Sequence, residues 1–181
     1  MDQTIRKLYQ LKNIERANRV KDRQESSAEH TWSCLMLADY FLTKHKMKLD
    51  RLHVYELLMY HDVVEIEAGD VPIHHNRDDK HDKEMKALDK LKNEIPVELR
   101  AKLVALFTEF EEEKTKEARF AKAIDKLDAT LHELDYPADW KGWTEPKVRK
   151  YNDKYFEGFP EIQKLHDELL KYVKAKGYYD G

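Results

Sequence analysis

Glycine, proline and cysteine are scarce in this sequence. Its 181 residues include only five glycines, five prolines and one cysteine, whereas 38% of them are charged. This composition favours a mostly helical chain with short connections, and the length suits one domain with a full hydrophobic core, so we predict an all-α protein. The single cysteine, Cys34, excludes an intrachain disulfide and a zinc cluster built from cysteines. Its apolar neighbours indicate a buried structural thiol.

A long apolar run and an excess of one charge are also lacking. No segment approaches the roughly 18 apolar residues that a membrane span needs, and the start, MDQTIRKLYQ, lacks the apolar stretch of a signal peptide. The net charge of -3, with both signs interspersed, predicts no basic surface for nucleic acid or for an anionic membrane. We therefore expect a cytoplasmic protein whose partners are small molecules or other proteins.

Apolar residues recur at helical spacing along most of the chain. Residues 2 to about 15 form the first such segment, and a capping box at Ser26 begins a second helix that ends near residue 46. Asp50 can cap a third helix, which runs to about Gly69 and is apolar on most sides, as expected of a central helix. Further helices are predicted at residues 80–93, 96–112, 116–134, 145–157 and 160–176. No pattern predicts a strand.

Polar side chains occupy three helical positions that should face the interior. His30 lies in the first turn of the second helix, the pair His61-Asp62 interrupts the apolar run LLMYHDVV, and Asp125 interrupts the apolar face of ARFAKAIDKLDATLHEL. Because an unpaired buried carboxylate is costly, such groups are normally neutralised, paired or bound to a metal. Taken alone, the His61-Asp62 sequence favours a buried hydrogen-bonded pair. Together with the other two side chains it favours a metal site.

Two imidazole nitrogens and two carboxylate oxygens form a mixed ligand set for a divalent cation. Such a set suits Mn, Fe, Co, Ni or Zn and leaves positions for water and substrate, which indicates catalysis rather than a structural role. On a continuous helix, Glu65 would lie one turn beyond His61, within reach of a water held by the ion. His132 could contact the ligands without binding the ion itself. Asp128 could bind a neighbouring cation or have no role.

Other histidines have less informative surroundings. His74 and His75 follow the GDVP turn and could line the mouth of the site, although loop histidines are usually solvated. The pair His166-Asp167, in KLHDEL, has polar neighbours and is expected on the surface.

An early His, a His-Asp pair and a late Asp on separate helices resemble the pattern of the HD-domain metal-dependent phosphohydrolases. More closely, residues 10 to about 135 resemble the small bacterial and archaeal 5'-deoxynucleotidase-like HD proteins. The stretches that carry the resemblance are SSAEHTWSCLMLA around His30, MYHDVVEIEAGDVP around His61 and KAIDKLDA around Asp125. The resemblance implies a single HD-domain helical bundle over residues 1–181. Its metal site would lie between helices, in a core of about residues 26–135, with C-terminal helices at 145–176.

Roles for particular residues follow from this resemblance. It implies that one divalent transition metal, Co or Mn or else Ni, Fe, Zn or Mg, is bound by His30, His61, Asp62 and Asp125. Glu65 would activate or position the attacking water, and Asp70, in the GDVP turn, would face the substrate and is the next candidate for proton acceptor. The family tends to carry an arginine and, shortly after it, a tryptophan near the nucleotide; Arg16 matches the arginine, whereas Arg19 stands in place of the tryptophan. The resemblance also implies a homodimer.

The predicted function is metal-dependent hydrolysis of deoxyribonucleoside or ribonucleoside 5'-monophosphates to nucleoside and phosphate. The alternatives are an HD phosphohydrolase of a nucleoside triphosphate, a cyclic nucleotide or a guanosine alarmone, and a nucleotide-binding module without turnover. Glu65 favours an enzyme, because a binding module has no reason to keep a titratable group beside the expected ligands.

Overall fold

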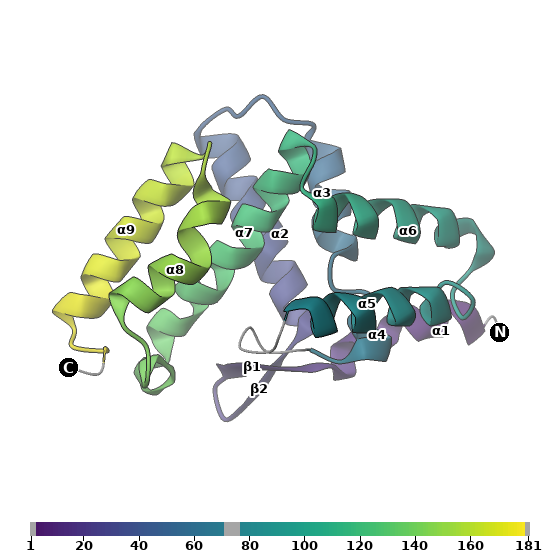
Figure 1. Ribbon diagram of the computed structural model, residues 1–181, viewed down its shortest axis with the longest axis horizontal. Helices are drawn as coiled ribbons and strands as arrows, with labels where there is room; N and C mark the ends of the chain where they lie inside the picture. Colours follow the sequence, from purple (N-terminus) through teal and green to yellow (C-terminus); the bar gives the residue numbers. More distant parts are fainter. Residues whose placement is uncertain (1–2, 71–76, 180–181) are drawn as a thin grey trace.

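The computed structural model describes residues 3–70 and 77–179, and within them most of the chain is helical (Figure 1). The helices are α1 (Gln3–Leu8), α2 (Ser27–Lys44), α3 (Arg51–Tyr60), α4 (Glu65–Ala68), α5 (Arg77–Leu91), α6 (Val97–Glu112), α7 (Lys116–His132), α8 (Glu145–Phe156) and α9 (Pro160–Ala175). Short 3-10 turns are η1 (Tyr9–Asn13), η2 (Glu133–Asp135) and η3 (Pro137–Trp140), and the strands are β1 (Glu15–Val20) and β2 (Arg23–Ser26). The predicted all-α class is confirmed, with one small hairpin added to it.

Helices α2 and α7 lie at the centre of the molecule. Helix α2 begins with the predicted capping box: Ser26 Oγ accepts a hydrogen bond from the Glu29 amide, and the Glu29 carboxylate accepts one from the Ser26 amide at 2.9 Å. Helix α7 begins at Thr115, whose hydroxyl oxygen accepts from the Ala118 amide at 3.1 Å. Figure 1 shows α8 and α9 on one side of α7, and α3 and α6 on the other. These N-terminal caps therefore fix the residue at which each central helix begins.

The main hydrophobic core joins these helices. Its fully buried members include Cys34 and Phe41 from α2, Leu57 and Leu58 from α3, Leu103 and Phe107 from α6, and Phe120 and Ile124 from α7. Complete burial of such side chains contributes roughly 1.5–3 kcal/mol each, so the core holds the helix ends in fixed relative positions. In the part of the chain that the structure describes, no helix is long and apolar enough to cross a membrane.

The predicted first helix, residues 2 to about 15, is α-helical only to Leu8 and continues as the 3-10 turn η1 to Asn13. No strand was predicted after it. However, β1 pairs antiparallel with β2, with Glu15 opposite Ser26 and Val20 opposite Arg23. Exposed and half-buried residues alternate along β1, a period of two that the polar composition hid at the sequence level. The hairpin also depends on distant partners, because Lys21 N donates to Tyr136 Oη at 2.9 Å and His132 Nε2 lies 2.7 Å from the Arg19 carbonyl oxygen.

The predicted third helix is interrupted at His61. Its ring nitrogen Nδ1 donates to the Leu58 carbonyl oxygen at 2.7 Å, which is the acceptor that a continuing α-helix would pair with the amide of Asp62. Helix α3 accordingly ends at Tyr60. Before α4 begins, the chain turns through hydrogen bonds between residues three apart, such as Glu65 N to the Asp62 carbonyl oxygen at 2.9 Å. Glu65 therefore does not lie on the same helix as His61.

The surface position predicted for His166 is also wrong. Its side chain is completely buried on the inner face of α9, against the ring of Phe156 at 4.8 Å between centroids, with Nδ1 3.4 Å from Asp153 Oδ1. Asp167, the next residue, pairs with Arg149 at 2.8 Å. His74 and His75 lie outside the described residues.

Candidate metal centre

The structure brings the four expected ligands together from three parts of the chain. His30 comes from α2, His61 and Asp62 from the turn after α3, and Asp125 from α7. Asp62 Oδ2 lies 3.1 Å from His61 Nε2 and 3.8 Å from His30 Nε2, and Asp125 Oδ1 lies 3.2 Å from His30 Nε2. The two imidazole rings are 5.4 Å apart between centroids. Each carboxylate thus lies against at least one of the two imidazoles, and the volume between these side chains is the candidate centre.

The environment of His61 tests whether a cation fits this volume. Because a carbonyl oxygen can only accept, Nδ1 must carry the proton that it donates to Leu58. In the neutral ring Nε2 then presents a lone pair, and this buried atom makes no hydrogen bond although Asp62 Oδ2 is 3.1 Å away. The Nε2 lone pair of His61 and the Asp62 carboxylate oxygen are both acceptors, so they repel each other where water does not separate them. A cation bound between them would make both atoms its ligands. The donor set therefore fits a divalent metal ion.

His30 meets a carboxylate at each ring nitrogen. Nε2 lies 3.2 Å from Asp125 Oδ1, and Nδ1 lies 2.8 Å from Asp128 Oδ2. The other oxygen of Asp125 pairs with the Lys126 ammonium at 2.9 Å. Burial would raise the pKa of Asp125, but Lys126 and His30 hold it well below its usual range. Asp125 is therefore a carboxylate, the form that a cation binds.

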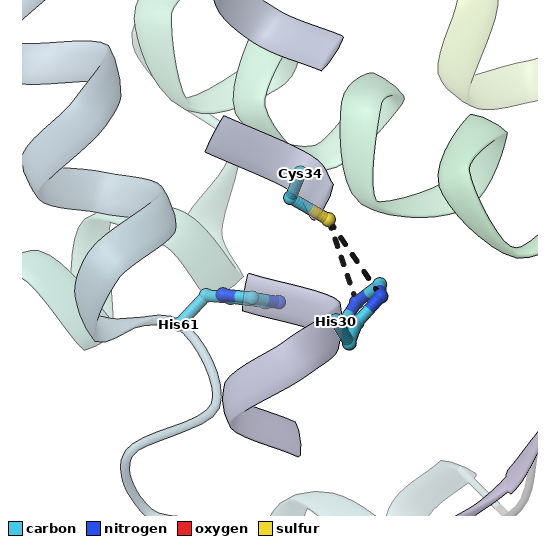
Figure 2. Close-up of side chains that lie close together, drawn as sticks. All are labelled: His30, Cys34 and His61. Carbon is cyan, nitrogen blue, oxygen red and sulfur yellow. Dashed lines mark hydrogen bonds between the residues drawn. The ribbon is translucent and has the colours of Figure 1, made fainter. Parts of the chain in front are cut away.

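Cys34 adds a sulfur atom that the sequence did not connect with the site (Figure 2). A nitrogen of His30, a nitrogen of His61 and Cys34 Sγ all lie within 4.8 Å of one another. Sγ is almost equally far from both nitrogens of His30, at 3.6 and 3.7 Å, so it lies beside the ring rather than in line with either lone pair. Burial raises the pKa of this thiol to about 12, which keeps it neutral and a weak ligand. Its spacing of four residues from His30 on one helix is the signal that could have found it.

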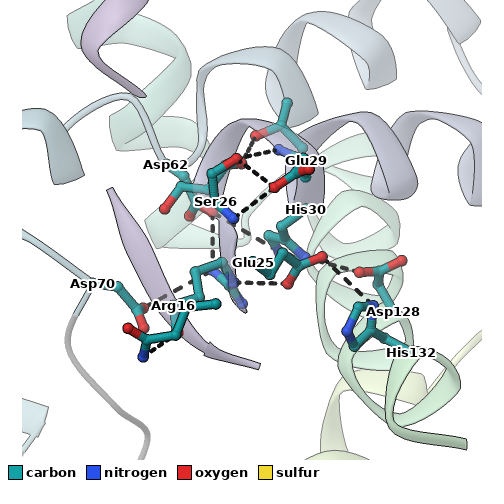
Figure 3. A network of polar contacts seen from close by, with 12 residues as sticks. Arg16, Glu25, Ser26, Glu29, His30, Asp62, Asp70, Asp128 and His132 are labelled. Carbon is teal, nitrogen blue, oxygen red and sulfur yellow. Dashed lines mark hydrogen bonds and ion pairs between the residues drawn. The ribbon is translucent and has the colours of Figure 1, made fainter. Parts of the chain in front are cut away.

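Arg16 connects the expected ligands to further carboxylates (Figure 3). Its Nη1 donates to Asp62 Oδ2 at 3.3 Å and lies 3.9 Å from Asp70 Oδ1, and its Nε is 3.5 Å from Glu25 Oε2. Burial alone would raise the pKa of Asp62, but His61 and Arg16 hold it well below its usual range. Glu25, buried on β2, was missed at the sequence level because its burial depends on the unpredicted hairpin.

Glu65 also lies at the centre, although it belongs to α4. Its Oε2 accepts a hydrogen bond from Ser27 Oγ at 2.6 Å, and the residue is buried. Burial, and then the negative charge of Asp62, raises the pKa of Glu65 to about 8 despite this bond. A carboxylate with a pKa near neutrality is suited to taking up a proton during catalysis.

Arg19 is not brought to the centre. It lies on β1 with Arg16 but at an exposed position of the alternating pattern, and its guanidinium pairs with Asp139 in η3. Together with the His132 and Tyr136 contacts described above, this pair ties the hairpin to the end of α7. The structure thus gives Arg19 a place in holding the strand that carries Arg16.

Comparison with known proteins identifies sequence relatives. The profile of the HD domain family matches residues 8–163. The 5'-deoxynucleotidase HDDC2 of Xenopus laevis is 30% identical over 139 residues, which cover 74% of this chain and 68% of that protein. The 5'-deoxynucleotidase HDDC2 of Homo sapiens is 27% identical over 178 residues, which cover 92% of this chain and 83% of that protein.

Solved structures provide a second comparison. A predicted metal-dependent phosphohydrolase from Magnetospirillum magnetotacticum MS-1 is 32% identical, with a TM-score of 0.84 over 96% of this chain and 91% of that one. An HD-domain phosphohydrolase from Listeria innocua is 20% identical, with a TM-score of 0.62 over 94% of this chain and 83% of that one. The latter likeness is one of fold.

The raised pKa of Glu65 predicts a pH-dependent stability effect in the metal-free protein. Between the ordinary value of 4.5 and about 8, folded Glu65 keeps a proton that the unfolded chain releases, so this group lowers stability as the pH rises through that range. Glu65→Gln keeps the shape and an acceptor for Ser27 but removes the titration. We expect the free energy of unfolding of the variant, minus that of wild type, to increase by at least about 1 kcal/mol from pH 5 to pH 8. Urea unfolding with a chelator present measures this difference.

Glu29→Gln is a matched control for this measurement. Arg23, and then the Ser26 amide, lower the pKa of Glu29 to about 2. Its stabilising effect is therefore complete above pH 4.5 and is lost only as the pH falls towards 2, so this variant should differ from wild type by a constant amount between pH 5 and pH 8. A Glu65→Gln difference that is equally constant would contradict the raised pKa.

Proposed function

The chain belongs to the HD domain family, whose members are metal-dependent phosphohydrolases, and from this premise we propose that it hydrolyses nucleoside 5'-monophosphates, deoxyribonucleotides above all, to nucleoside and phosphate. The relatives named 5'-deoxynucleotidase support this substrate class. We also propose that residues 1–181 form one HD domain, which the match over residues 8–163 supports.

The unpaired Nε2 of His61 is the observation that carries the proposal. We assign His30, His61, Asp62 and Asp125 as ligands of one divalent transition metal, because their donor atoms surround a buried volume in which this lone pair faces a carboxylate. When bound, such an ion lowers the pKa of a coordinated water and polarises a phosphoryl oxygen. Imidazole ligands favour Mn, Co or a related ion over Ca.

Glu65 is the proposed proton acceptor. Ser27 holds one of its carboxylate oxygens at 2.6 Å, which fixes the group at the edge of the centre. From this position its carboxylate can take a proton from the attacking water and release it again. Asp70, 3.9 Å from Arg16, is the next candidate for this role and the proposed contact to the nucleoside.

Arg16 is the proposed phosphate contact. Its guanidinium lies 3.3 Å from Asp62 Oδ2, so a phosphate bound at the centre would be within its reach. The Arg16 Nε is buried without a hydrogen bond, and a planar guanidinium can donate to two phosphate oxygens at once. Asp62, Asp70 and Glu25 balance its charge.

The activity is tested by phosphate release from deoxyribonucleoside and ribonucleoside mono- and triphosphates, with Mn, Co, Ni, Mg and Ca supplied in turn to metal-free protein. We expect the highest kcat/KM for a 5'-monophosphate with Mn or Co. Glu65→Gln should bind the metal and nucleotide but lose roughly two or more orders of magnitude in kcat, which also excludes a contaminating phosphatase.

Several results of this screen would contradict the proposal. Preference for a nucleoside triphosphate over every 5'-monophosphate would assign another substrate to the same centre. Nucleotide binding without turnover under every metal would indicate a binding module. Activity that survives chelation would remove the metal from the account.

A second prediction separates the two arginines of β1. Arg16→Lys keeps the positive charge that balances Asp62 but loses the planar pair of donors, so kcat/KM for every nucleotide should fall about tenfold or more. Arg19→Lys alters a side chain that pairs with Asp139 and should change kcat/KM less than twofold. Steady-state kinetics of both variants measure this contrast, and equal effects would place the phosphate contact elsewhere.

A further inference from the structure

The Nδ1 atoms of the two histidines of the centre contact different groups. Each directs Nε2 towards the shared carboxylates, Asp62 at 3.1 Å from His61 and Asp125 at 3.2 Å from His30. Behind His61, Nδ1 donates to a neutral backbone oxygen of Leu58 at 2.7 Å. Behind His30, Nδ1 lies 2.8 Å from the Asp128 carboxylate. Asp128 therefore contacts a proposed ligand without reaching the centre itself.

The position of Asp128 on α7 explains this contact. It follows Asp125 by three residues, so both carboxylates lie on the face of α7 that packs against α2. Asp128 is 5% exposed and His30 is 1% exposed, so neither side chain can exchange this bond for water. The ring of His30 is thus held at both nitrogens by two carboxylates one helical turn apart.

We propose that Asp128 is a positioning residue that sets the tautomer and orientation of His30 for metal binding, an inference that rests on the proposed metal site. A carboxylate accepts a hydrogen bond from a protonated Nδ1, which leaves the Nε2 lone pair directed at the centre. A negatively charged partner also makes the imidazole a stronger donor to a metal than a neutral carbonyl does. His30 is accordingly the more tightly oriented of the two imidazole ligands.

Metal affinity distinguishes positioning from a purely structural role. Asp128→Asn keeps the size of the side chain and an oxygen that can accept a hydrogen bond from Nδ1, but it removes the negative charge. We expect the dissociation constant for Mn²⁺, measured by calorimetry on metal-free protein, to rise about 10- to 100-fold, while unfolding stays cooperative. Asp128→Ala, which removes the acceptor as well, should bind Mn²⁺ more weakly still. A Mn²⁺ affinity within about twofold of wild type for Asp128→Asn would overturn the inference.

A matched control lies elsewhere in the fold. Asp153 faces the buried His166, with Asp153 Oδ1 and His166 Nδ1 3.4 Å apart, and both belong to the α8–α9 pair. Asp153→Asn makes the same chemical change beside a buried histidine that takes no part in the centre. Its Mn²⁺ affinity should equal that of wild type, whatever its stability. An equal loss of affinity in this variant would make the effect of Asp128→Asn one of general destabilisation and overturn the inference.

The wild-type protein permits a test that needs no variant to fold. In the zinc-loaded protein, nitrogen NMR of His30 should show a protonated Nδ1 and a metal-bound Nε2. A protonated Nε2 would overturn the positioning role of Asp128. Failure of wild-type protein to bind Mn²⁺ or Zn²⁺ would instead overturn the proposed metal site, and so the two failures are distinguishable.

Discussion

The close approach of imidazole and carboxylate groups in one largely buried centre is the constraint on which the rest of the structure depends. His61 Nε2 and Asp62 Oδ2 lie 3.1 Å apart without a hydrogen bond, and Asp125 is buried close by. Groups arranged in this way repel one another unless a positive charge lies among them. Arg16 and Lys126 supply part of that charge from the rim, at 3.3 and 2.9 Å from the two aspartates. A divalent cation would supply the remainder at the centre.

The side chains of the centre are positioned mainly by residues at helix ends, and less by residues in helix interiors. The capping box at Ser26 places His30 in the first turn of α2, and the same start places Ser27 against Glu65. The end of α3 is set by His61 itself, whose ring takes the Leu58 carbonyl that the helix would need to continue. Only α7 contributes from its interior, where Asp125 faces α2 in an otherwise apolar stripe. The buried charges are thus held close together because the surrounding core fixes these three elements.

The sequence was informative where a signal was local. The capping box at Ser26, the cap at Asp50, the long amphipathic helices and the inward-facing polar positions of His30 and Asp125 all depend on residues a few positions apart. The hairpin was missed because β1 is held by partners about 115 residues away, such as Tyr136 with Lys21. The break at His61 and the burial of His166 likewise follow from contacts that periodicity does not encode. The four expected ligands could be singled out because they occupy helical positions that should face the interior, whereas Glu25 sits in a polar stretch and gave no such signal.

The central claim is that one cation is bound by two imidazoles and two carboxylates. Crystals grown with Co²⁺ and measured at its absorption edge test this most directly, because anomalous scattering locates the ion independently of any assumed ligand. The account predicts one strong peak per chain, in contact with Nε2 of His30 and of His61 and with the carboxylates of Asp62 and Asp125. A peak bound by Cys34 in place of the carboxylates, or no peak among these residues in active protein, would contradict it.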